Sequence, residues 1–138
     1  MNVLVSPSIL NADFLHLSDA VDVINKSEAD WLHLDIMDGI YVPNLTFGFP
    51  VISQIKSIAK KPLDVHLMIA EPDRHLERFK DAGADILTVH IEACTHLHRT
   101  IQHIHALGMK AGVALNPHTP VLLLKDILHD LDLVLIMT

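Results

Sequence analysis

The 138-residue chain is half hydrophobic and carries a formal net charge of −7 at pH 7. This composition supplies enough apolar residues for one domain with a sizeable core, and it excludes a disordered chain. The negative charge argues against broad nucleic-acid binding, which uses basic surfaces.

The sequence also limits the compartment in which the protein works. The lone Cys94 rules out a disulfide framework within the chain and fits a reducing environment. The N-terminal residues lack the basic region of a signal peptide. No segment approaches the roughly 20 apolar residues of a membrane helix. We therefore expect a soluble cytoplasmic protein with neither a membrane nor a nucleic acid as partner.

Short apolar runs rich in β-formers alternate with amphipathic stretches along the chain. The predicted strands span residues 3–10, 31–37, 63–68, 85–91, 109–115 and 131–137. The predicted helices lie between them, near residues 14–27, 47–59, 73–82, 95–107 and 119–129. Pro72 and Asp73 are typical of a helix start, and Gly83 and Gly108 are typical of helix ends.

This alternation predicts βα units around a parallel sheet. A unit of roughly 22 to 32 residues suits a (β/α)8 TIM barrel, whose typical chain has about 250 residues, better than a doubly wound nucleotide fold. We interpret residues 1–138 as a single barrel domain with about six strands and five helices. Because residues 131–138 read as an unfinished strand, we expect the C-terminal βα units to be missing.

Two neighbouring strands carry polar residues in an alternating pattern. His33 and Asp35 share one face of the second predicted strand, and Asp64 and His66 share one face of the third. In a barrel this face points inward, and its carboxyl end opens into the active site. Two imidazoles and a carboxylate form a candidate site for Zn²⁺, Fe²⁺ or Mn²⁺. The alternative is a buried His–Asp hydrogen bond that only orders the barrel.

Other residues at strand ends allow two interpretations each. Ser8 follows the first predicted strand, where it would contact a substrate or cap the next turn. Met37, Met68 and Met137 all end strands. Residue type alone favours ordinary core methionines, and their equivalent positions suggest an apolar wall around a site.

The connections after the strands raise similar alternatives. Asp38 and Gly39 predict a turn, and residues 40–48 form either part of a lid or an ordinary βα connection. We interpret His90 and Glu92 as a hydrogen-bonded pair, rather than as an outer shell of the site. Four more histidines are predicted to lie on a solvated helix face: His96, His98, His103 and His105.

Four segments together resemble the ribulose-phosphate 3-epimerase family: SPSILNADF, HLDIMDGIYVPNLTFG, PLDVHLM and NPHTP. The resemblance covers essentially the whole chain, in order and with similar spacing. It implies a (β/α)8 barrel that interconverts D-ribulose 5-phosphate and D-xylulose 5-phosphate through an enediolate, in the pentose phosphate pathway. It also implies one divalent metal ion (Zn, Fe, Mn or Co), a phosphorylated ketopentose as substrate, and a homo-oligomer. The segment DIMDG lacks the lysine found in related decarboxylases and hexulose-phosphate synthases.

The resemblance assigns roles to individual residues. It implies that His33, Asp35 and His66 bind the metal, and that Asp35 is also one of two acid/base carboxylates. It further implies that Ser8 and His66 contact the substrate. It also implies that three methionines flank the reacting carbons of the substrate: Met37, Met68 and Met137.

Two features expected of this family remain unassigned on the residues given. The second carboxylate, which is also the fourth ligand, and the phosphate-binding loops have no counterpart among these 138 residues. A sister epimerase that acts on a six-carbon ketose phosphate such as allulose 6-phosphate would use the same residues. A catalytically silent fragment is the remaining alternative, and we expect the 138-residue polypeptide alone to be inactive and prone to aggregation.

Overall fold

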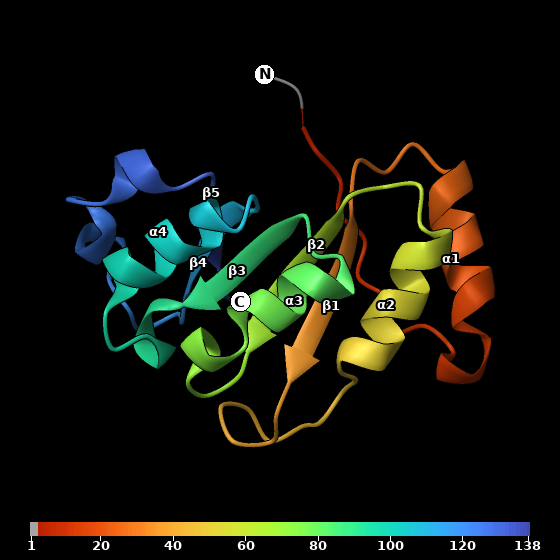
Figure 1. The fold of residues 1–138 in the computed structure, drawn as a ribbon, viewed down its shortest axis with the longest axis horizontal. Coiled ribbons are helices and arrows are strands. Elements are labelled where there is room, and N and C mark those ends of the chain that lie inside the picture. Colours follow the sequence, from red (N-terminus) through yellow and green to blue (C-terminus); the bar gives the residue numbers. More distant parts are fainter. Residues whose placement is uncertain (1–2) are drawn as a thin grey trace.

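A parallel sheet organises residues 3–138, the part of the chain that the computed structural model describes (Figure 1). The predicted domain also includes residues 1–2, which lie outside the described part. The strands are β1 (Leu32–Met37), β2 (Leu63–Met68), β3 (Ile86–His90), β4 (Lys110–Leu115) and β5 (Leu133–Ile136). They lie in the order of the sequence, and each neighbouring pair is parallel. This sequential parallel order is that of a (β/α)8 barrel.

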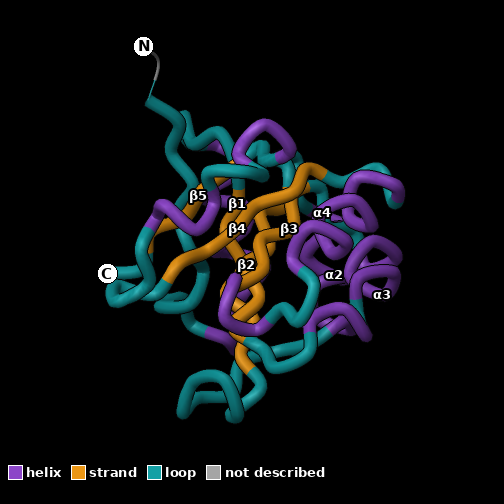
Figure 2. Tube along the Cα trace, turned by 90° about the vertical axis from the view of Figure 1, so that its left-hand side faces the viewer, coloured by secondary structure: helices purple, strands orange, loops and turns teal. Residues whose placement is uncertain are grey.

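Helices connect the strands and cover one face of the sheet. They are α1 (Leu17–Lys26), α2 (Phe49–Ile58), α3 (Leu76–Ala82) and α4 (Leu97–Ala106). Figure 2 shows α2, α3 and α4 on the same side of the strands. None of the helices in the described part is both long enough and apolar enough to cross a membrane.

The alternation predicted for the second strand is present in β1. Leu32, Leu34 and Ile36 are buried in the core, whereas the intervening side chains are only half-buried. Burial of this aliphatic face removes apolar surface from water and holds the sheet against the helices. The opposite face of β1 is thereby left to His33 and Asp35.

The predicted helix boundaries at glycine are confirmed. Gly83 ends α3 in a left-handed conformation with φ of 107°, and Gly108 follows α4 with φ of 77°. A Cβ atom on Gly83 would also lie 2.4 Å from Cγ of Lys56, so the position requires glycine twice over. Pro72 begins a 3-10 turn, Pro72–Arg74, and α3 itself begins later, at Leu76.

The strand predicted at 3–10 is wrong as a regular strand. The segment runs parallel to β1 through a single bridge, Ser8 to His33, although the carbonyl of Pro7 accepts the His33 N–H at 2.9 Å. Pro7 has no N–H to donate, so a continuous ladder cannot form across it.

The helix predicted at 119–129 is also wrong. Two 3-10 segments occupy this stretch, η4 (Val121–Leu124) and η5 (Leu128–Asp130). Leu124 is 1% exposed, whereas Leu122 is 72% exposed. Because a helix is stabilised mainly by packing an apolar face, one buried anchor does not hold a full α-helix in place.

Candidate metal centre

Pairing of β1 with β2 brings the predicted polar residues together. The register places Asp35 opposite His66, and His33 opposite Asp64. Residues in register on neighbouring strands point to the same side of a sheet, so four polar side chains meet on the face away from the helices. Asp64 and His66 are buried there, and His33 and Asp35 are half-buried.

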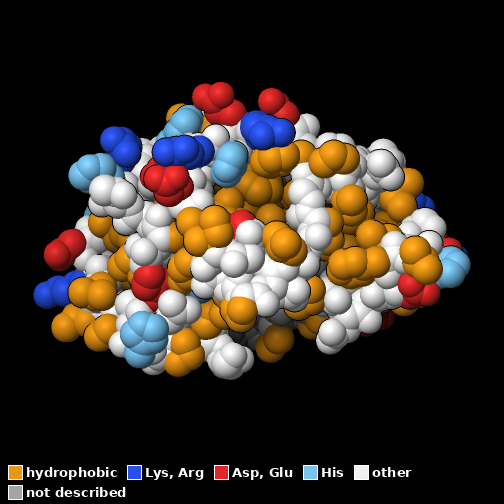
Figure 3. Space-filling view, turned by 90° about the horizontal axis from the view of Figure 1, so that it is seen from below, with side chains coloured by type: hydrophobic (Ala, Val, Ile, Leu, Met, Phe, Trp, Pro, Cys, Tyr) orange, Lys and Arg blue, Asp and Glu red, His pale blue; other side chains and the backbone are white. Residues whose placement is uncertain are grey.

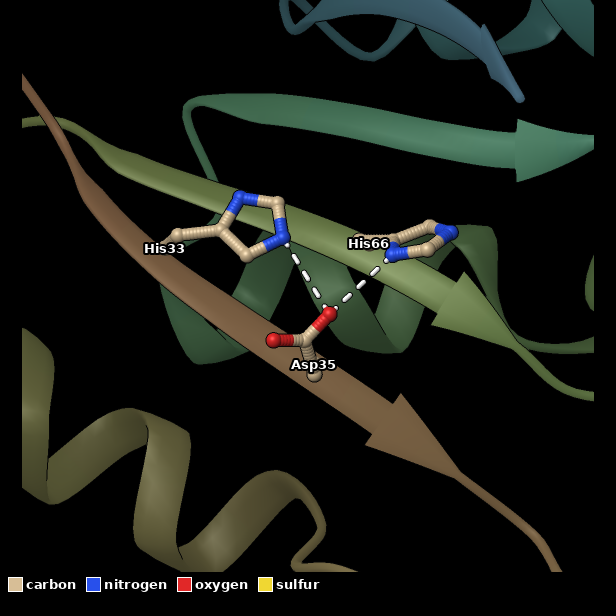
Figure 4. A group of neighbouring side chains, drawn as sticks. All are labelled: His33, Asp35 and His66. Atoms are coloured by element: carbon tan, nitrogen blue, oxygen red, sulfur yellow. Dashed lines mark hydrogen bonds and ion pairs between the residues drawn. The ribbon is translucent and has the colours of Figure 1, made fainter. Parts of the chain in front are cut away.

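One oxygen of Asp35 lies between two imidazole rings (Figure 4). Nε2 of His33 is 3.2 Å from Oδ1 of Asp35, and Nδ1 of His66 is 3.1 Å from the same oxygen. The three residues offer one ligand atom each, all within 4.8 Å of one another.

The two nitrogen–oxygen distances fit a shared metal ion. Two atoms that are each about 2.1 Å from one ion, at angles of 90° to 109°, lie about 3.0–3.4 Å apart. Two imidazole nitrogens and a carboxylate oxygen are also donors that first-row divalent ions accept. The donor set of His33, Asp35 and His66 therefore fits the ion that the sequence predicts. The hydrogen bonds of the alternative interpretation are present in the same contacts.

Asp64 orients His33 through the ring nitrogen that does not face Asp35. Nδ1 of His33 lies 2.7 Å from Oδ2 of Asp64, which also accepts a hydrogen bond from the Ser6 hydroxyl at 2.9 Å. Burial lowers the pKa of His33, but hydrogen bonds to Asp35 and Asp64 outweigh burial and raise the pKa to about 9. A proton therefore occupies Nε2 of His33 near neutral pH when no metal is bound there, and the position favours positive charge.

Asp35 is held in its ionised form. Burial acts to raise its pKa, but hydrogen bonds from His33 and Ser8, together with the contact to His66, hold the pKa well below its usual range. The Ser8 hydroxyl donates to Oδ2 of Asp35 at 2.6 Å and accepts the Leu10 N–H at 3.1 Å. Both interpretations of Ser8 are thus compatible with its position, since it caps a turn and also touches the centre.

His90 and Glu92 form the predicted pair, with Nδ1 of His90 3.2 Å from Oε2 of Glu92. Sequence reasoning missed a second contact, because Nε2 of His90 also lies 2.8 Å from Nε2 of His66. Burial lowers the pKa of His90, against the opposing influence of Glu92. No pattern in the sequence indicates this contact, because it depends on the register of β2 and β3, which pairs His66 with Thr88.

The three methionines all lie at carboxyl ends of strands. Met37 and Met68 are register partners on β1 and β2, and Met68 is buried. Met137 follows β5, and its N–H donates to the Leu115 carbonyl at 3.0 Å. Strands β3 and β4 lie between Met137 and the other two.

The connection after β1 is anchored beside the centre. Asp38 accepts hydrogen bonds from the N–H groups of Ile40, Tyr41 and Ala70, and Gly39 has φ of 75°, as the predicted turn requires. The Thr46 hydroxyl donates to the Asp35 carbonyl at 2.8 Å. The segment 40–48 is therefore tied to the strand that carries two of the candidate ligands.

Three of the four histidines predicted on a solvated helix face are exposed, His96, His98 and His105, whereas His103 is half-buried. His98 and His105 are exposed and approach Asp130 and Asp132 at 3.3 and 2.9 Å. These contacts are surface pairs that contribute little to stability.

Helices on one face of a sequential parallel sheet, with a polar cluster on the other face, define the class as a (β/α)8 barrel, here in part. The sequence model of the ribulose-phosphate 3 epimerase family matches residues 4–138. The chain belongs to this family.

Similar proteins agree with this assignment. A ribulose-phosphate 3-epimerase from Bacillus subtilis is 55% identical over 97% of this chain and 62% of its own length. One from Synechocystis is 50% identical over 99% of this chain and 60% of its own length. This chain thus spans about three fifths of the length of these curated relatives.

The structural comparison supports the fold alone. A mutant tryptophan synthase alpha-subunit from Pyrococcus furiosus superposes with a TM-score of 0.70 at 17% identity. The match covers 97% of this chain and 64% of that protein, and that protein is a TIM barrel.

Proposed function

We propose that this protein acts as a metal-dependent ribulose-phosphate 3-epimerase, which interconverts D-ribulose 5-phosphate and D-xylulose 5-phosphate. Family membership and the names of the similar proteins support the substrate. The observation that carries the proposal is the convergence of donor atoms from His33, Asp35 and His66 within 4.8 Å of one another.

The metal would be held by Nε2 of His33, Oδ1 of Asp35 and Nδ1 of His66, which face one another. This donor set accepts Zn²⁺, Fe²⁺, Mn²⁺ or Co²⁺. A divalent ion bound here supplies positive charge that makes the proton beside the substrate ketone more acidic.

Asp35 would act as one of the two acid/base carboxylates at C3 of the sugar. Its low pKa keeps it ionised and able to accept a proton, although as a weak base. Oδ1 faces the imidazoles, so Oδ2, which also accepts a hydrogen bond from the Ser8 hydroxyl at 2.6 Å, would take the C3 proton. Loss of this proton to Asp35 leaves a planar enediolate, and a second acid on the opposite face would deliver another proton there and so invert C3.

The remaining predicted residues would surround the substrate. Ser8 and His66 lie beside Asp35, and both would contact the sugar. Met37, Met68 and Met137 would form an apolar wall that keeps water from the reacting carbons. The homo-oligomer and the cytoplasmic location remain predictions from the sequence.

Two substitutions in the full-length protein test the centre. Asp35→Asn and His66→Ala each remove a ligand atom, so we expect both to lose bound metal. We also expect turnover to fall by about 10²–10⁴-fold, the usual effect of losing a positioned acid or base. Metal analysis and a coupled epimerase assay measure these effects, and D-allulose 6-phosphate assayed alongside distinguishes the six-carbon alternative.

The exposed Asp126 offers a matched control, since Asp126→Asn makes the same chemical change far from the centre. Chelator treatment followed by Zn²⁺, Fe²⁺, Mn²⁺ or Co²⁺ identifies the ion that restores activity. Normal metal content with a normal rate in both ligand variants would refute the proposal.

A further inference from the structure

A chain of polar groups continues from His66 away from the metal centre. His66 and His90 have side chains 3% and 0% exposed, and their ring centroids are 5.0 Å apart with planes tilted by 29°. The rings therefore meet edge to edge through their Nε2 atoms, 2.8 Å apart. Only one proton fits between two nitrogens at this distance, so one imidazole donates and the other accepts.

Glu92 sets the direction of this hydrogen bond. Its Oε1 accepts from the Asn116 N–H at 2.8 Å and from the Thr119 hydroxyl. Its Oε2 accepts from the Tyr41 hydroxyl at 3.1 Å and faces Nδ1 of His90 at 3.2 Å. An ionised carboxylate only accepts hydrogen bonds, so Nδ1 of His90 carries the proton.

The protonation of His90 in turn determines which nitrogen of His66 carries a proton. With its proton on Nδ1, the neutral ring of His90 presents a lone pair at Nε2, and Nε2 of His66 donates to it. Nδ1 of His66 is left with a lone pair that points toward Oδ1 of Asp35, 3.1 Å away. Two lone pairs that converge in this way repel each other unless a cation lies between them.

We propose that His90 and Glu92 are positioning residues that fix His66 in the tautomer with a proton on Nε2, so that Nδ1 is free to bind the metal ion. This inference rests on the metal centre proposed above. His90 would orient His66 in the way that Asp64 orients His33. Most metal-binding histidines are oriented by an outer hydrogen bond of this kind.

The tautomer can be observed directly. In zinc-loaded, ¹⁵N-labelled full-length protein, we expect the NMR spectrum to show a proton on Nε2 of His66. We also expect a scalar coupling across the hydrogen bond from that nitrogen to Nε2 of His90. A zinc-loaded protein with the proton on Nδ1 of His66, or without the coupling, would overturn the inference.

Glu92→Gln tests the direction of the relay. If the amide oxygen keeps the contacts to Asn116 and Thr119, its NH₂ group faces His90 and donates to Nδ1. Each hydrogen bond then reverses, and the proton of His66 moves to Nδ1, the ligand atom. We expect zinc affinity, measured by competition with a chromophoric chelator, to fall about 10–100-fold, the usual effect of losing an outer partner.

Substitution of His90 provides a second test that separates hydrogen bonding from packing. His90→Leu removes the acceptor, so we expect a loss of zinc affinity similar to that of Glu92→Gln. His90→Gln keeps an acceptor oxygen, so we expect affinity within about threefold of the unaltered protein. His105→Gln is the matched control, because His105 pairs with Asp132 at 2.9 Å on the surface.

The outcomes distinguish this inference from the proposed function. If the unaltered protein binds no zinc, the metal centre is wrong and the relay fails with it. If the unaltered protein binds zinc and both Glu92→Gln and His90→Leu bind it equally well, only the relay is wrong. A selective loss in these two variants, with recovery in His90→Gln, supports the relay.

Discussion

Asp35 joins more of the centre than any other single residue. Oδ1 faces the imidazoles of His33 and His66, and Oδ2 accepts the Ser8 hydroxyl. The three candidate ligands were predictable from sequence, because side chains on a strand alternate faces and the pattern repeats in two strands. The contacts of Asp64 with His33 and of His90 with His66 were not, since they depend on which residues pair across strands, and the register depends on the whole sheet.

Cys94 provides a pH-dependent prediction at the same scale. Burial, with a contribution from the negative charge of Asp73, raises the pKa of its thiol to about 12. The thiolate is the reactive form, so alkylation by iodoacetamide at pH 8 should be about 10³-fold slower than for a thiol of pKa 9. The rate should rise about tenfold per pH unit up to pH 11, because each unit increases the thiolate fraction tenfold.

Mass spectrometry of timed samples measures this alkylation. The same protein unfolded in urea is the control, since unfolding returns Cys94 to water. Equal rates in the folded and unfolded protein would show that the thiol is not protected.

At the scale of elements, the sequence predicts regular segments with buried faces well and weakly packed segments poorly. The strands β1 to β5 and the helices α1 to α4 were all expected within a few residues of their bounds. The segments 3–10 and 119–129 differ because Pro7 interrupts a ladder and because only Leu124 anchors η4 in the core. Composition and periodicity report the intrinsic preference of a segment, whereas tertiary packing decides whether that preference is realised.

Tyr41 links the connection after β1 to residues that follow the carboxyl ends of β3 and β4. Its hydroxyl donates to Glu92 and accepts from Nδ2 of Asn116 at 2.9 Å. Burial, with the charge of Glu92, raises the pKa of Tyr41 to about 12, so the hydroxyl remains a donor at working pH. Tyr41→Phe should therefore lower the free energy of unfolding by about 1.5–3 kcal/mol, the value for a hydrogen bond to a charged group.

Hydrogen exchange and urea unfolding check this prediction. Amides of residues 40–46 should exchange faster in Tyr41→Phe, and those of α1 serve as the internal control because they lie on the helical side. Unchanged exchange in residues 40–46 would mean that the other anchors, Asp38 and Thr46, hold the segment alone.

At the scale of the whole molecule, a large apolar surface is exposed. Val3, Leu4 and Val5 are 53% or more exposed and line a groove of about 780 Å³ with Val23 and Ile24. Figure 3 shows hydrophobic side chains spread over much of another face, with most charged side chains near its edges. Exposed apolar patches of this kind promote association between molecules.

A polypeptide of residues 1–138 alone should therefore self-associate and lack epimerase turnover. In the described part of the chain, β5 pairs with β4 alone, which leaves its other edge open to further pairing. Light scattering at increasing concentration measures the association, and the coupled assay measures turnover. A monodisperse monomer with measurable turnover would contradict this prediction.

The sequential strand order has a consequence for biosynthesis. All three donor residues lie on β1 and β2, which are neighbours joined by one helical crossover. The three candidate donors are therefore all encoded before residue 69, ahead of the later βα units in the order of synthesis.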